Sequence, residues 1–179
     1  IRLDPSQEKI HALLGGMYLE ANDLGNAERV LRQLTERFPK SYAGHFLMGR
    51  FHLAHGNQAQ AEKELWRCAE IEPDSLDPLF ELLKLYRQQG KKPDVLKVNQ
   101  EILQRDPDNS RASLELALFY RQAGMKGEAD AILKPLGEKS SSEVEVILQL
   151  VQLYVDPKKY DEAIFLINGM LKGAPQSPD

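Results

Sequence analysis

Cysteine, tryptophan and long apolar runs are scarce in this sequence. Cys68 is the only cysteine among 179 residues, which excludes an intramolecular disulfide and a cysteine-ligated zinc cluster. No apolar run approaches the ~18 residues needed to cross a bilayer, so we expect no direct membrane insertion. A basic excess is also missing, because 27 acidic residues outnumber 23 basic ones. Since a general nucleic-acid binder usually carries a concentrated basic face, we expect no nucleic-acid partner.

These absences leave the compartment open. A single cysteine suits a reducing cytoplasm, but a periplasmic location is equally compatible with it. No secretory signal is visible at the start of the chain. We therefore expect a soluble protein of the cytoplasm or the periplasm.

Proline, in contrast, is present and regularly spaced. Four prolines follow one another at intervals of 34 residues, the next step falls on Ser141, and the step after that restores the pattern. The prolines of this series are Pro5, Pro39, Pro73, Pro107 and Pro175. A fixed period of this length is the signature of a repeat architecture, in which each proline would end a helix.

Other residue types keep the same phase. A small residue recurs at Gly15, Gly49 and Ala117, although Leu83 and Val151 are larger. Three residues later an aromatic residue recurs, and further on an alanine, with Val95 as an exception. These two series are Tyr18, His52, Tyr86, Tyr120, Tyr154 and Ala27, Ala61, Ala129, Ala163. The pattern is typical of two helices that approach closely at the small residue and stack on the next pair.

The pattern resembles that of the tetratricopeptide repeat family over essentially the whole chain. The resemblance implies an all-α, right-handed superhelical solenoid of antiparallel helix pairs. The chain would form a single array, and because it begins at Ile1 and stops where another unit should begin, we expect it to be a fragment of a longer one. The expected units are 8–41, 42–75, 76–109, 110–143 and 144–177, with residues 1–7 as the tail of a preceding repeat.

One unit departs from the pattern. Pro135 falls inside the second helix expected in unit 110–143, and residues 137–142 replace the usual proline stop. The irregular end is either a shortened helix followed by a linker or a hinge before the last unit.

Groups able to carry catalysis or hold a metal ion do not assemble into a recognisable motif. His11 and His45 share one repeat position and His52 takes the aromatic position, so we interpret these histidines as packing residues. Cys68 sits on an inward stripe, where a buried structural thiol is expected. No nucleophile elbow, phosphate loop or dinucleotide fingerprint is present. We therefore expect no enzyme activity, no cofactor and no metal site.

The resemblance also implies where a partner would bind, since in this family the first helices of successive units line a concave groove. Reading the groove positions from the repeat phase gives apolar residues flanked by a basic cluster, with Glu81 and Glu115 nearby. The predicted partner-binding residues are Phe46, Arg50, Leu53, Phe80, Lys84, Arg87, Leu114, Arg121 and Leu148. The alternative is that the two phenylalanines pack on adjacent helices while the arginines form surface pairs.

The sequence thus favours a protein–protein interaction scaffold, part of a larger assembly, that binds a peptide or helical segment with apolar and acidic residues. The second hypothesis is a non-catalytic regulatory or substrate-presenting arm of an enzyme encoded elsewhere in the parent chain. We also expect that the ends of the fragment can associate with each other, because neither end carries a polar capping helix.

Overall fold

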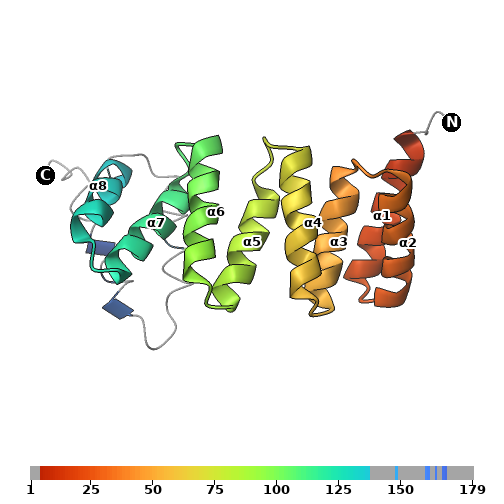
Figure 1. Ribbon diagram of the computed structural model, residues 1–179, viewed down its shortest axis with the longest axis horizontal. Helices are drawn as coiled ribbons and strands as arrows, with labels where there is room; N and C mark the ends of the chain where they lie inside the picture. The colour runs from red at the N-terminus through yellow and green to blue at the C-terminus, as the bar shows by residue number, and fades with distance from the viewer. Residues whose placement is uncertain (1–4, 138–147, 149–159, 162–163, 165–166, 169–179) are drawn as a thin grey trace, which may run out of the picture. The chain divides into compact units, whose positions relative to one another are not determined.

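The computed structural model describes residues 5–137 together with residues 148, 160, 161, 164, 167 and 168. Within 5–137 the chain forms α-helices and no strand (Figure 1). It divides into two compact parts, Ile1–Lys91 and Lys92–Asp179, which are described separately below.

The first part contains five helices. Consecutive helices pack on one another, and α1 also contacts α3. The helices are α1 (Pro5–Glu20), α2 (Leu24–Arg37), α3 (Tyr42–Ala54), α4 (Gln58–Ile71) and α5 (Asp77–Gln88).

The second part contains α6 (Lys92–Arg105), α7 (Ser110–Gln122) and α8 (Lys126–Gly137), in which α7 packs on both α6 and α8. Pro135 lies inside α8, which continues to Gly137. The two interpretations of the irregular end fall on 138–147, outside the described residues.

The prolines of the 34-residue series follow the helices as expected in three cases. Pro39, Pro73 and Pro107 come directly after the one-residue ends of α2, α4 and α6. Pro5 differs, because it is the first residue of α1 rather than the end of a preceding helix. Proline is compatible with the first turn of a helix, where its missing N–H would have no partner in any case. Residues 5–7, expected as the tail of a preceding repeat, therefore belong to α1, while the bounds of the five units remain predictions.

The turns within helix pairs repeat at the level of backbone conformation. Asn22 (φ 55°), Gly56 (φ 77°), Gly90 (φ 68°) and Gly124 (φ 80°) are 34 residues apart and all left-handed. At each turn the next residue donates its backbone N–H to a carbonyl five residues earlier, as in Asn57 N to His52 O at 2.8 Å. Glycine adopts this conformation without the steric cost that a Cβ imposes, which explains why it fills three of the four turns.

Two glycines let paired helices approach closely. A Cβ added at Gly15 would lie 2.4 Å from Leu31 Cδ2, and one added at Gly49 would lie 3.0 Å from both Cδ2 and Cγ of Leu65. The sequence predicted that the small residue of the first helix faces the alanine of the second. The nearest groups are leucine side chains instead, with the Ala61 carbonyl oxygen at 3.7 Å from the Gly49 position.

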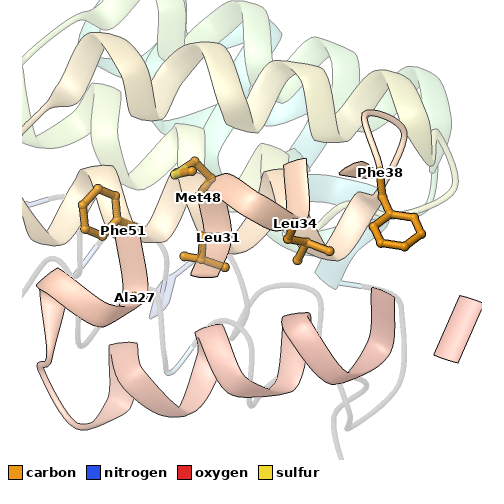
Figure 2. Packing of buried hydrophobic residues seen from close by; sticks show 6 residues of the cluster. All are labelled: Ala27, Leu31, Leu34, Phe38, Met48 and Phe51. Atoms are coloured by element: carbon orange, nitrogen blue, oxygen red, sulfur yellow. The ribbon is translucent and has the colours of Figure 1, made fainter. Parts of the chain in front are cut away.

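The core of the first part spans successive helix pairs. Ala27, Leu31, Leu34 and Phe38 of α2 and the residue after it form one buried cluster with Met48 and Phe51 of α3 (Figure 2). Leu31 and Leu34 are fully buried, so α2 contributes its apolar stripe both to its own pair and to the next one. Because each pair covers the apolar face of its neighbour, the stack is stabilised by contacts between neighbours.

Candidate functional site

The predicted binding residues of the first part lie on α3 and α5. Phe46, Arg50 and Leu53 follow one another on α3 at steps of four and three residues, which places them on one face. Phe80, Lys84 and Arg87 repeat this spacing on α5, 34 residues later. The same face is therefore presented twice by two first helices of successive pairs.

Four of these side chains line one pocket of about 260 Å³, together with Glu81. Phe46 and Leu53 are half-buried and supply its apolar wall, while Arg50 and Lys84 are exposed and supply two positive charges. Glu81 adds one carboxylate, so the pocket keeps a net positive charge. Phe80 and Arg87 are half-buried on α5 and do not line this pocket.

The N-terminal end of α3 is held in place by several polar contacts. Ser41 caps the helix by accepting the backbone N–H of Gly44 at 3.0 Å. Tyr42 and Ser75 share a hydroxyl–hydroxyl hydrogen bond of 2.7 Å, and the Tyr42 ring stacks on Phe46 with centroids 5.8 Å apart. This stack limits the rotamers of Phe46, so the apolar wall of the pocket is formed before any ligand arrives.

The remaining predicted residues belong to the second part and do not share one surface. Leu114 is only 1% exposed, and Glu115 is 3% exposed, so neither offers a side chain to a partner in this structure. Arg121 lines a different hollow of about 510 Å³ with Lys126, Asp130 and Asp161 among others. Leu148 is 51% exposed. The repeat phase alone could not separate these cases, because the number of neighbours that cover a position is set by packing.

Cys68 is a structural residue. It is fully buried on α4 and its thiol donates to the Tyr42 carbonyl at 3.4 Å. Burial raises the pKa of the Cys68 thiol to about 12. Since the thiolate is the reactive form, this cysteine is inert near neutral pH, and the predicted structural thiol is confirmed.

His45 connects α3 to α4 in a way that favours a proton on both ring nitrogens. Its Nδ1 lies 2.6 Å from Glu64 Oε2 and its Nε2 lies 3.1 Å from the Pro39 carbonyl oxygen. Both partners are acceptors, so only the imidazolium donates to both at once. The hydrogen bond to Glu64 raises the pKa of His45, against partial burial and the charge of Arg67, and it lowers the pKa of Glu64.

This pair predicts a loss of stability at alkaline pH. The raised pKa of His45 means that its contribution is complete below ~6.5, the value of the unfolded chain, and is lost as pH rises through the folded pKa. The lowered pKa of Glu64 gives a contribution that is lost only as pH falls through a value below its unfolded ~4.3. We expect the urea midpoint to fall between about pH 6.5 and 9, and Glu64→Gln to flatten that decline.

Two features make the experiment specific. Burial lowers the pKa of His52, so its contribution is present above ~6.5 and is lost on acidification, outside the alkaline range. Glu70→Gln removes an exposed carboxylate from the same helix as Glu64 and serves as the control that keeps the wild-type decline. An equal slope in the Glu64→Gln and wild-type chains would contradict the assignment of the charged pair.

Comparison with known proteins identifies the repeat. The family model described as tetratricopeptide repeat matches residues 14–73, which run from within α1 to just past α4. The chain is a tetratricopeptide-repeat protein. Repeats of this family are in general protein–protein interaction scaffolds with extended concave binding surfaces. No curated protein matches the chain.

Solved tetratricopeptide structures show the same fold at low sequence identity. A tetratricopeptide repeat protein from Parabacteroides merdae has a TM-score of 0.65 and 18% identity, with 96% of this chain and 68% of that chain covered. MamA has a TM-score of 0.61 and 17% identity, with 83% of each chain covered. PilF of Pseudomonas aeruginosa has a TM-score of 0.61 and 18% identity, with 97% of this chain and 79% of that chain covered. The predicted all-α tetratricopeptide solenoid class is confirmed.

Two searches of the described residues add limits. None of the helices is long and apolar enough to cross a bilayer in the part of the chain that the structure describes. Within that same part, no group of three or more His, Cys, Asp or Glu side chains is placed to hold a metal ion.

Proposed function

We propose that this tetratricopeptide chain binds a protein segment on the shared face of α3 and α5, with an apolar side chain of the ligand in the pocket between Phe46 and Leu53. The pocket itself is the observation that carries the proposal, because four of the residues predicted from repeat phase line it. The segment is held within a larger protein assembly for which the chain serves as a scaffold.

The size of the pocket favours a side chain as its occupant. Its volume of about 260 Å³ is below the ~300–1,000 Å³ typical of small-molecule and cofactor sites. An apolar hollow of this size with charged residues at its rim is suited to one anchor residue of a peptide.

The charges around the pocket favour acidic residues next to that anchor. Arg50 and Lys84 are both exposed, and each stands at the ninth position of its 34-residue unit. Exposed rim charges of this kind contribute to partner choice and to the rate of association more than to affinity. Glu81 reduces the positive charge without cancelling it, so the favoured ligand is amphipathic rather than highly acidic.

The test uses synthetic amphipathic peptides that carry leucine or phenylalanine anchors flanked by aspartate and glutamate, compared with the same peptides carrying lysine. We expect the acidic set to bind and the lysine set to fail. The double variant Arg50→Glu/Lys84→Glu is expected to weaken binding of the acidic set about tenfold or more, which corresponds to about 1.4 kcal/mol. Fluorescence anisotropy with labelled peptides measures the Kd.

A matched charge reversal elsewhere provides the control. Lys63 is exposed on α4 and does not line the pocket, so Lys63→Glu is expected to keep the Kd of the parent chain. Phe46→Ala is expected to weaken binding as well, since it removes the apolar wall. If peptides of both charges bind equally, or if Lys63→Glu weakens binding as much as the double reversal, the α3–α5 face is not the site.

A further inference from the structure

The outer face of α1 carries an unusual stripe of exposed apolar side chains. Ile10 is 62% exposed, Leu13 69%, Leu14 38% and Met17 58%. Their spacing of three, four and seven residues places them on one face of the helix. Single exposed apolar residues are ordinary on a protein surface, but a continuous stripe marks a surface made for contact.

The repeat period tells what this stripe would contact. Adding 34 to Leu14 and Met17 gives Met48 and Phe51 of α3, which are 8% and 3% exposed. These two residues are buried against Leu31 and the rest of the α2 stripe (Figure 2). On α5 the equivalent residues of the next unit, Leu82 and Leu85, are buried too. The α1 stripe is therefore the face that receives the second helix of a preceding pair.

The other end of the chain offers the matching half of that contact. Tyr160 (54% exposed), Ile164 (54%) and Ile167 (42%) have helical backbone and share one helical face. Subtracting four periods from Tyr160 and Ile167 gives Leu24 and Leu31. Both of these residues pack in the cluster that holds Met48 and Phe51. The exposed residues near the end thus occupy the positions that, in the first pair, grip the next one.

We propose that two copies of this chain associate head to tail, with Tyr160 and Ile167 of one copy packed against Leu14 and Met17 of the other. The contact continues, between molecules, the interface that α2 makes with α3 and α4 makes with α5. A second copy is the occupant because one chain carries both halves of the contact in matching repeat positions. The inference does not depend on the proposed peptide site, whose residues lie on a different face of α3 and α5.

A polar contact in the structure adds a register to this association. Trp66 of α4 donates from Nε1 to the Tyr86 hydroxyl of α5 at 3.2 Å. Moving each residue by its own number of periods, forward for Trp66 and back for Tyr86, gives Asn168 and Tyr18. Asn168 is exposed and Tyr18 is half-buried, so an amide–hydroxyl hydrogen bond between copies accompanies the apolar contact.

Head-to-tail contact has a distinctive consequence for assembly. It uses two different surfaces, so each added molecule leaves a free stripe and growth continues into an open chain. Pairing of two α1 stripes would use one surface twice and stop at a dimer. These two modes are separable by blocking one end at a time.

The experiment uses Met17→Glu to block the α1 stripe and Ile167→Glu to block the other end, with sedimentation velocity as the readout. For the parent chain we expect a weight-average mass that rises with concentration to about twice the 20.3 kDa monomer or more. Each variant alone is expected to stay monomeric. An equimolar mixture is expected to form a 1:1 dimer and no larger species, because one intact end of each kind remains.

Every other outcome contradicts the proposal. A parent chain that is monomeric at all concentrations excludes association. If Ile167→Glu alone dimerises while the mixture forms nothing new, α1 pairs with α1. If Met17→Glu alone dimerises, the other end pairs with itself. Gln60→Glu, an exposed charge introduced on α4, is the control that keeps the association of the parent chain. Thermal melting of the variants checks folding, which we expect to be unchanged because both substituted side chains are largely exposed.

Discussion

The Leu31→Ala variant is expected to lower the free energy of unfolding by about 2–5 kcal/mol. Leu31 is fully buried, its methyl group lies against the Gly15 position of α1, and its side chain belongs to the cluster with Met48 and Phe51. The substitution therefore weakens both the α1–α2 pair and the interface with the next pair. In a stacked repeat these two terms add, so a residue that serves both is costly to truncate.

Urea denaturation followed by circular dichroism measures this loss. Leu13→Ala is the matched control, because it removes the same atoms from a side chain that is 69% exposed, and we expect a change within about 0.5 kcal/mol. Both variants are measured at low protein concentration, so that contact between copies does not contribute. Similar losses in the two variants would mean that Leu31 is not the central contact of the cluster in Figure 2.

The 34-residue period could be predicted from the sequence because its physical causes are local. Proline lacks an N–H, so it marks the ends of α2, α4 and α6 wherever it occurs. Glycine accommodates a left-handed backbone, so it marks the turns at Gly56, Gly90 and Gly124. Each signal depends on one residue type and its own backbone, and neither requires knowledge of what packs around it.

What could not be predicted depends on neighbours. Leu114 and Phe80 share one repeat position, yet Leu114 is 1% exposed while Phe80 is half-buried. The role of Glu64 as the partner of His45 was missed, although the two lie on paired helices, because a hydrogen bond needs a relative rotation that the period does not give. Pro5 has the spacing of a helix-ending proline but begins α1 instead. Sequence phase assigns a position to each residue, and packing then decides what that position does.

The Gly49→Leu variant is the second large expected effect, a loss of about 1–3 kcal/mol from overpacking. A Cβ at this position would already be 3.0 Å from two atoms of Leu65, and a leucine adds three further carbons in the same direction. Leucine has a better helix propensity than glycine, by just under ~1 kcal/mol, which offsets part of the clash. Gly127→Leu isolates that offset, because nothing lies within 4 Å of a Cβ at Gly127 on α8. We expect the control to be unchanged or slightly more stable in thermal and urea unfolding.

A double-mutant cycle with Leu65→Ala then separates the clash from other causes. Leu65 is fully buried, so Leu65→Ala alone is expected to cost about 2–5 kcal/mol through the cavity it leaves. In the chain carrying both changes, the new leucine at 49 occupies the space that Leu65 vacates. The combined loss is therefore expected to be smaller than the sum of the two single losses by at least ~1 kcal/mol. Additive losses would show that Gly49 and Leu65 do not share one space, and the close approach of α3 and α4 would need another explanation. A coupling of the expected sign would assign the glycine position of the repeat to the leucine that faces it.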